Sequence, residues 1–363
     1  MTPIAIDGPA NAVAAETRAR LLALINANWT TQAISAATQL RLAELLSDGP
    51  LTVEVMAHRA SCHTQSLGRL LRALTSLGVV SEQEVGHFGL TELGALLRPD
   101  APGSLAAWAE FCGTSSWRSW SQLAECVRSG ESVRKRTRGI DGFDHLQEDR
   151  DAALLFNRAM VSLTTSVASA LMQAMDFCGS ERVVDVGGGL GGLVAGILRA
   201  HPKMRGVLFD LSHATQTAGA LLAQCDVAER CEVVTGSFFD SVPSGADVYL
   251  LKSILHDWDD VQCAVILANC RHAMGPRSRL LVIERMMPEQ MAVSLRDQGI
   301  ARSDLNMLIG TGGRERTQEQ FRAMLQATGL RATRLIALSE GYAAYESVPV
   351  ECRAELIHIS SND

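Results

Sequence analysis

The residues of this chain best suited to chemistry are one histidine and several carboxylates that follow apolar runs. The segment LKSILHDWDD places Lys252, His256 and Asp257 directly after one such run. Glu284 closes a second run, LLVIE, and Glu315 lies further along in GGRERT. A carboxylate beside a histidine orients the imidazole and raises its pKa, which makes the histidine a general base. A phenol, with a pKa of about 10, needs such a base to become a good nucleophile.

A second candidate site is the glycine-rich stretch RVVDVGGGLGG, residues 182–192. A β-branched run that contains Asp185 leads into the glycines, and apolar residues at helical spacing follow them. Such a turn lets a ligand approach the backbone and points free helix N–H groups at it. Gly187 and Gly189 also open a G-x-G-x-x-G pattern, with Asp210 closing the next strand, as in dinucleotide-binding proteins. Asp185 would repel a pyrophosphate but suits a cationic ligand such as S-adenosylmethionine, so a nicotinamide dehydrogenase is the weaker alternative.

The elements that position these residues alternate between strands and helices from residue 182 onwards. The expected strands are 182–186, 205–211, 231–236, 247–251, 280–284, 331–338 and 342–347. The last two lie close together around Gly341 and predict a terminal antiparallel pair. The others predict a parallel, doubly wound, Rossmann-like α/β sheet, whose ligands bind at the carboxyl ends of the strands. Both candidate sites follow strand ends, so we expect them at the same edge of the sheet.

Composition excludes several classes of protein. The chain has 363 residues, 47% hydrophobic and 20% charged, and a net charge of −7, which describe a globular protein and argue against nucleic-acid binding. Its nine cysteines form no C-x-x-C pair, so we expect no disulfide framework, no zinc site and a reducing cytoplasm. No run of 18 apolar residues occurs, so we expect no membrane span. Asp257, Asp259 and Asp260 imitate a magnesium site, but their spacing is more typical of a solvated helix start, and we predict no metal.

The first part of the chain predicts a winged helix-turn-helix. Helical patterns over 51–59 and 64–77 precede a small hairpin around Gly86. Because the second helix offers only Arg69 and Arg72 as basic residues, we expect this region to serve in dimerisation rather than in DNA binding. A helical region with scattered aromatic residues follows, in which RKRTR at 134–138 is expected to be a solvated loop. The expected division is a dimerisation domain over 1–102, a helical linker and substrate-pocket region over 103–177, and a catalytic domain over 178–363.

The motifs together resemble those of the S-adenosylmethionine-dependent small-molecule O-methyltransferases, namely the plant-type family and its relatives in bacterial secondary metabolism. The matching segments are VVDVGGGLGG, FDL, GSFF, LKSILHDWDD, LLVIE and GGRERT. The resemblance covers nearly the whole chain. It implies a class I methyltransferase domain with a seven-stranded, mainly parallel sheet, and a winged-helix N-terminal region. It also implies an interlocked homodimer in which that region contributes to the partner's substrate pocket.

The resemblance also implies roles for particular residues. His256 resembles the family's catalytic base, Glu284 and Glu315 the acids that orient it, and Asp257 a supporting acid. The residues expected at the cofactor are Asp185, Gly187, Gly189, Asp210, Leu211, Ser237, Phe238 and Lys252. Ser237 departs from the family's usual aspartate, and His213 departs from its usual D-L-P segment. The residues expected around a flat, apolar acceptor are Trp108, Phe156, Met160, Trp258, Asn306 and Met307.

The expected reaction is in-line methyl transfer to a hydroxyl of a small acceptor, with His256 removing the proton and no metal taking part. Two alternatives are open. One is an enzyme of the same fold with another reaction, such as N- or C-methylation, hydroxylation, decarboxylation or a pericyclic rearrangement. The other is a winged-helix regulator that reads DNA and senses a metabolite.

Overall fold

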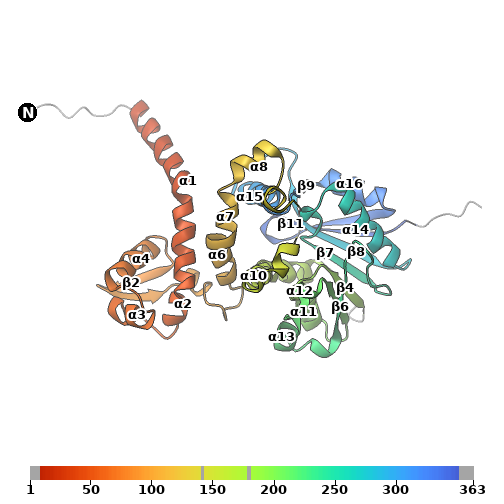
Figure 1. The fold of residues 1–363 in the computed structure, drawn as a ribbon, viewed down its shortest axis with the longest axis horizontal. Coiled ribbons are helices and arrows are strands. Elements are labelled where there is room, and N and C mark those ends of the chain that lie inside the picture. The colour runs from red at the N-terminus through yellow and green to blue at the C-terminus, as the bar shows by residue number, and fades with distance from the viewer. Residues whose placement is uncertain (1–8, 140–142, 178–180, 351–363) are drawn as a thin grey trace, which may run out of the picture. The chain divides into compact units, whose positions relative to one another are not determined.

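The structure is a computed structural model that describes residues 9–139, 143–177 and 181–350 (Figure 1). The chain divides into two compact units, Met1–Arg118 and Ser119–Asp363. Each unit is described below by itself.

The N-terminal unit contains a winged helix. Helices α3 (Val53–Arg59) and α4 (Thr64–Ser76) precede a hairpin of β2 (Val80–Glu84) and β3 (His87–Leu90), and β3 also pairs with β1 (Leu51–Thr52). Apolar side chains from these elements form one buried cluster. The predicted order of helix, turn, helix and hairpin is confirmed. The other elements of this unit are α1 (Pro9–Gln39), α2 (Leu42–Leu45), α5 (Glu92–Ala95), α6 (Ala106–Phe111), the π-helical turn η1 (Cys112–Ser116) and the start of α7 (Trp117–Trp120).

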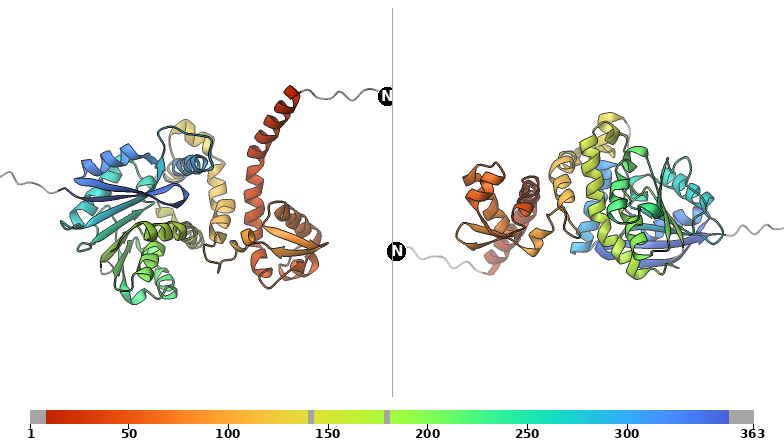
Figure 2. Two further views of the ribbon diagram at one scale, coloured as in Figure 1. Left: turned by 180° about the vertical axis from the view of Figure 1, so that it is seen from behind. Right: turned by 90° about the horizontal axis from the view of Figure 1, so that it is seen from below.

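Helix α1 has an uncovered apolar stripe. Its first half extends away from the rest of the N-terminal unit (Figure 2). Leu21, Leu24, Ile25 and Trp29 follow helical spacing and are 58%, 63%, 60% and 67% exposed. Such a stripe costs free energy in water and is typical of a surface that binds another protein.

The second unit is built on one large sheet. Its strands are β4 (Arg182–Val186), β5 (Arg205–Asp210), β6 (Cys231–Thr235), β7 (Val248–Lys252), β8 (Arg279–Met287), β10 (Leu330–Ala337) and β11 (Tyr342–Pro349). They lie in the order β10-β11-β8-β7-β4-β5-β6, and the short β9 (Arg316–Thr317) adds an eighth strand beside β8. The pairs among β4 to β8 are parallel, whereas β11 is antiparallel to both of its neighbours. The predicted mainly parallel sheet with a terminal antiparallel pair is confirmed.

Helices cover both faces of this sheet. The helices of this unit are α8 (Leu123–Ser129), α9 (Val133–Arg138), α10 (Arg150–Ala174), α11 (Gly192–Ala200), α12 (Ser212–Thr215), α13 (Ala218–Gln224), α14 (Asp260–Ala273), α15 (Leu295–Gly310) and α16 (Gln318–Ala327), with short turns η2 (Asp144–Gln147), η3 (Ala228–Arg230), η4 (Leu255–Asp257) and η5 (Ser339–Gly341). Successive residues of a strand point to opposite faces, so Val183 joins the core under α10, α11 and α13, and Val184 joins the core under α14 and α16 (Figure 1). The doubly wound arrangement leaves the carboxyl ends of the parallel strands free for a site.

Helix α10 is, among the described residues, the only helix long and apolar enough to cross a membrane by length and composition. It packs against α11, and its residues Val167 and Leu171 are fully buried in the core of the second unit. The burial of these side chains in the core therefore explains the apolar character of the helix.

The segment 134–138 corrects one prediction. The sequence predicts a solvated loop; the segment is largely exposed, as predicted, but it forms most of the helix α9. Ser132 caps this helix by accepting a hydrogen bond from the backbone N–H of Lys135, and Gly139 ends it with a left-handed backbone. The helix therefore has a cap at each end, which the run of basic residues by itself did not indicate.

Candidate active site

His256 lies on the short turn η4 at the carboxyl end of β7. Ser253 turns the chain out of the strand with a positive φ of 54°. Glu284, on the neighbouring parallel strand β8, then accepts hydrogen bonds through Oε1 from the backbone N–H groups of Ile254 (2.9 Å) and Leu255 (2.8 Å). A carboxylate at the start of a helical turn satisfies its free N–H groups, so Glu284 fixes the turn that carries His256.

Glu315 approaches the same histidine from the GGRERT loop. Its Oε1 lies 3.1 Å from Nδ1 of His256 and also accepts a hydrogen bond from Ser303 Oγ at 2.6 Å. The backbone N–H of Glu315 donates to Asp304 Oδ1 at 2.8 Å. With an ionised Glu315, Nδ1 carries the hydrogen, and Nε2 of His256 is left as the basic nitrogen.

Arg316 ties the loop of Glu315 to the turn of His256. Its buried guanidinium donates to the carbonyl oxygens of Leu255 and Trp258, each at 2.7 Å, and forms an ion pair with Asp260 at 2.9 Å. The backbone N–H of Arg314 donates to the carbonyl of His256 at 2.8 Å. These contacts fix the GGRERT loop and the turn that carries His256 relative to each other.

The acids around His256 strengthen it as a base. Burial alone would lower the pKa of His256, but Glu284, Glu315 and Asp257 raise it well above its ordinary value. Burial raises the pKa of Glu284 to about 7. For Glu315 burial acts in the same direction, but the charge of His256 and the hydrogen bonds from His256 and Ser303 bring its pKa below the ordinary value. The two glutamates are therefore unequal, and Glu315 is the one that stays ionised.

The acids after His256 differ from one another. Asp259 caps helix α14, and Asp260 is half exposed, as expected for a solvated helix start. Asp257 is not solvated: its side chain is 11% exposed, with Oδ1 3.9 Å from Nε2 of His256. Burial raises its pKa. The expectation of a solvated helix start therefore holds for two of the three acids and is wrong for Asp257.

Ligand-type atoms of His256, Glu284 and Glu315 lie within 4.8 Å of one another. Nδ1 of the histidine is already engaged by Glu315, and Glu284 Oε1 already accepts two backbone N–H groups. We therefore interpret the cluster as a group that holds and releases a proton, and the absence of a metal from the reaction stays a prediction.

The glycine loop lies against the histidine turn. A Cβ added to Gly187, whose φ is 71°, would meet Ile254 Cδ1 at 2.4 Å and Phe238 Cε1 at 3.4 Å. Gly189, with a φ of 59°, has no atom within 4 Å of such a Cβ, so its exposed face is open to a ligand. The two carboxylates of this region, those of Asp185 and Asp210, are held by backbone N–H groups.

Asp185 and Asp210 support the loop in different ways. Asp185 is 1% exposed and accepts a hydrogen bond from the backbone N–H of Val194, in the first turn of α11. Burial raises its pKa to about 7. Asp210 accepts from the backbone N–H groups of Gly189 (2.7 Å) and Leu211 (2.6 Å), which orient its carboxylate beside the open glycine.

The remaining residues expected at the cofactor also gather at this edge. Lys252 Nζ donates to Thr164 Oγ1 of α10 at 3.3 Å. Ser237 accepts a hydrogen bond from the backbone N–H of Phe239, so its hydroxyl already has a local partner. An adenosyl ligand with a cationic end fits this set of residues. The open face of the glycine loop allows the ligand to approach the backbone, and the buried carboxylates can accept hydrogen bonds from its hydroxyl groups. The ring of Phe238 offers a flat contact for its base.

Aromatic rings line the side of the histidine turn. Trp258 packs edge-on against Phe238 and Phe143, with centroid distances of 6.0 and 6.3 Å, and Phe143 lies 5.6 Å from Phe156. Trp258 and Phe156, two of the expected acceptor-binding residues, are thus joined through Phe143, another aromatic residue of the predicted substrate-pocket region.

The other expected acceptor-binding residues have different surroundings. Asn306 of α15 accepts a hydrogen bond from Trp120 Nε1 at 3.1 Å, and Met307 is 8% exposed. Met160 lies on α10, where its carbonyl accepts from Thr164. Trp108 belongs to the N-terminal unit, where it stacks on Phe111 at 5.7 Å.

Sequence reasoning missed four residues of the site: Ser303, Asp304, Arg316 and Tyr342. The cations of Lys252 and Arg285 lie 5.5 and 4.5 Å from the centre of the Tyr342 ring, and the Tyr342 hydroxyl is 3.2 Å from Ser253 Oγ. Arg316 has a signal in the sequence, because it follows Glu315 within the motif. The others carry no local pattern that marks them.

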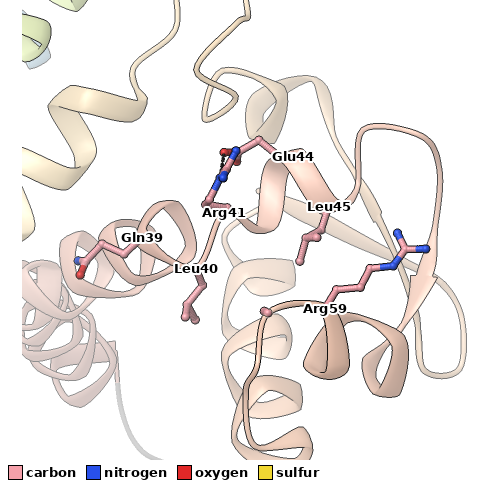
Figure 3. A pocket seen from close by; sticks show the side chains of 7 residues that line it. Gln39, Leu40, Arg41, Glu44, Leu45 and Arg59 are labelled. Atoms are coloured by element: carbon pink, nitrogen blue, oxygen red, sulfur yellow. Dashed lines mark hydrogen bonds and ion pairs between the residues drawn. The ribbon is translucent and has the colours of Figure 1, made fainter.

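A pocket of about 460 Å³ lies in the N-terminal unit, lined by Gln39, Leu40, Arg41, Glu44, Leu45, Arg59 and Ala60 (Figure 3). Its polar contact is the ion pair between Arg41 and Glu44 at 2.9 Å, where Arg41 is largely exposed. An exposed ion pair without a nucleophile or base gives this pocket no catalytic chemistry.

Comparisons with known proteins agree with the geometry. An O-methyltransferase domain matches residues 120–331, and an O-methyltransferase dimerisation domain matches residues 22–100. A phenazine O-methyltransferase of Lysobacter antibioticus is 37% identical over 330 residues, 91% of this chain and 96% of that protein. A 3-amino-4-hydroxybenzoate 4-O-methyltransferase of Streptomyces cremeus is 38% identical over 315 residues, 86% of this chain and 85% of that protein.

A solved structure shares the whole fold. Human N-acetylserotonin methyltransferase in complex with S-adenosylmethionine superposes with a TM-score of 0.84 at 26% identity, covering 96% of this chain and 100% of that one. The chain belongs to the S-adenosylmethionine-dependent O-methyltransferases that carry an N-terminal dimerisation domain.

Proposed function

We propose that this enzyme methylates a hydroxyl group, preferably a phenol, of a small aromatic acceptor from secondary metabolism, with His256 as the base. The observation that carries the proposal is the hydrogen bond between Glu315 and Nδ1 of His256, on a turn packed against the glycine loop. The relatives named above act on a phenazine and on a hydroxybenzoate, both aromatic. The aromatic cluster around Trp258 supports a flat acceptor.

The chain's own residues divide the work. Gly187, Gly189 and Asp210 would hold the cofactor, and Phe238 would lie against its adenine. S-adenosylmethionine, when bound, supplies a methyl group bonded to a positively charged sulfur. An acceptor oxygen can attack the methyl carbon, with the sulfur as the leaving group. Nε2 of His256 takes the proton of the acceptor hydroxyl.

The acids around His256 then hold the charge that it gains. Glu315 fixes Nδ1 and stabilises the imidazolium, and Glu284 holds the turn in place. Asp257, buried beside Nε2, adds a further negative charge next to the forming cation.

We also propose a homodimer held by the dimerisation domain, in which the N-terminal region, including Trp108, completes the partner's substrate pocket. The uncovered stripe of α1 supports this assembly. The seven cysteines of the described segments are free thiols, which is consistent with the expected cytoplasmic location; Cys178 and Cys352 lie outside the described residues.

The test is methyl transfer from S-adenosylmethionine to 3-amino-4-hydroxybenzoate and to a panel of hydroxylated phenazines and naphthoates. We expect one methyl group on oxygen, identified by mass spectrometry and NMR. His256→Gln keeps the size of the side chain but removes the base, so the rate should fall by about 10²- to 10⁴-fold while S-adenosylmethionine still binds.

This acceptor also separates the competing reactions. A product methylated on the amino nitrogen would replace the proposal with N-methylation. Full activity of His256→Gln would exclude His256 as the base.

A further inference from the structure

Ser303 differs from several other hydroxyl-bearing residues in the described helices. The hydroxyls of Thr75, Ser129 and Thr164 each donate to the backbone carbonyl four residues earlier in their own helix. Ser303, in the middle of α15, instead donates across to Oε1 of Glu315 at 2.6 Å. A hydroxyl that turns from its own helix to a buried carboxylate makes a charge-assisted hydrogen bond, which is stronger than a bond to a carbonyl.

The neighbouring residue of α15 holds the backbone of the same glutamate. Asp304 Oδ1 accepts the N–H of Glu315, so adjacent residues of one helix grip both its main chain and its side chain. The oxygen that Ser303 holds is the one that contacts Nδ1 of His256 at 3.1 Å. The other oxygen, Oε2, is buried without a hydrogen-bond partner.

We propose that Ser303 is a positioning residue of the methyl-transfer site: its hydroxyl holds Glu315 Oε1 against Nδ1 of His256 and thereby leaves Nε2 free to take the acceptor's proton. The inference rests on the proposed function, because it assigns Ser303 a part in the work of the proposed base. Ser303 acts through Glu315 and needs no contact with the acceptor.

The loss of this hydroxyl has a predictable direction. Without it, the anion of Glu315 loses a donor and is left more dependent on the positive charge of His256. The histidine should therefore bind its proton more tightly, and its titration should move to higher pH. The other charged or titratable groups that act on this pair are unchanged by the substitution; they are Asp257, Glu284, Arg285, Asp304 and Tyr342.

The experiment follows the ring protons of His256 by NMR in histidine-labelled protein, with His256→Gln to assign the signal. Ser303→Ala should raise the titration midpoint of His256 by half a pH unit or more, about a threefold gain in proton affinity. Ser303→Thr, which keeps the hydroxyl, should titrate like the wild type. Ser303→Cys has a side chain of similar size with a weak hydrogen-bond donor, so its His256 midpoint should lie between those of the alanine and threonine variants. It takes the place of the alanine variant if that variant does not fold.

Ser76→Ala is the matched control, because the exposed hydroxyl of Ser76 donates to a carbonyl of its own helix α4. An unchanged midpoint in both Ser303→Ala and Ser303→Cys would overturn the proposal, as would a threonine variant that behaves like alanine. The acid limb of methyl transfer should move with the midpoint. The NMR titration needs no acceptor, so an absence of methyl transfer would count against the proposed function and leave the assignment of Ser303 decided by its own measurement.

Discussion

Glu284 and Glu315 offer the same functional group to one histidine but stand in different surroundings. Glu284 takes two backbone N–H groups on one oxygen, and its burial raises its pKa to about 7. Glu315 takes a hydroxyl and the imidazole N–H, and its pKa is lowered in spite of burial. The donors around each acid therefore give them separate tasks, one holding the turn and one orienting the base.

Asp185 allows a test of burial at the scale of a single residue. Its pKa is about 7 in the folded protein, against about 3.9 in an unfolded chain, so between these values the folded state binds the proton more tightly. The free energy of unfolding contributed by Asp185 is therefore highest at low pH. It falls by about 1.4 kcal/mol per pH unit as the pH rises through this window.

Asp185→Asn removes this pH dependence but keeps an oxygen that can accept from Val194. Relative to the wild type, the variant should gain about 3 kcal/mol of stability between pH 5 and pH 8. The measurement is denaturant unfolding at both pH values without cofactor. If the free energies of unfolding of the two proteins changed by the same amount between the two pH values, Asp185 would not be the buried acid that the structure describes.

At the scale of elements, the site depends on close packing between the GGRERT loop and the histidine turn. Arg316 joins them through two backbone carbonyls and an ion pair with Asp260. Gly313 lets the two backbones touch, since a Cβ there would stand 2.0 Å from the carbonyl oxygen of His256. The rigidity of the base is thus a property of two segments that lie far apart in the sequence.

Gly313→Ala should therefore displace the histidine turn. A misplacement of about 1 Å is enough to lower methyl transfer about 100-fold, while binding of S-adenosylmethionine, measured by calorimetry, changes little. Gly310→Ala is the control, because Gly310 lies at the end of α15 with nothing within 4 Å of an added Cβ. If both variants kept wild-type activity, the close contact between the loop and the turn would not matter for catalysis.

At the scale of the whole molecule, the exposed stripe of α1 implies assembly. A stable interface buries more than about 1,000 Å², and a long helix with several large uncovered apolar side chains can supply much of that area. The double substitution Leu24→Glu with Trp29→Glu should convert a dimer into a monomer, as measured by sedimentation. If the partner completes the acceptor pocket, the KM for the acceptor should be higher in the double variant than in the wild type, and the affinity for the cofactor should be unchanged.

Glu16→Lys serves as the control, because it changes a charge on the same helix outside the apolar stripe. It should remain dimeric. A wild-type protein that sediments as a monomer would remove the basis for the proposed assembly.

Much of the architecture could be predicted from the sequence because it depends on local patterns. The β-branched runs, the glycines after Val186 and the helical periodicities determined the order of strands and helices. Since parallel strands end at a common edge, the sequence predicts that the residues after Val186, Leu251 and Ile283 lie together. His256, Glu284 and the glycine loop were found in this way.

Only the tertiary structure decided how these residues act on one another. Ser303 lies in an ordinary helical pattern, and its bond to Glu315 depends on how α15 packs beside the GGRERT loop. The sequence likewise suggested Asp185 as a ligand group, whereas the fold places its carboxylate on the N–H of Val194 at the start of α11. Local sequence specifies which elements form, because propensity and periodicity act over a few residues. Hydrogen bonds between distant segments, and the pKa values that follow from them, depend on packing that no local pattern contains.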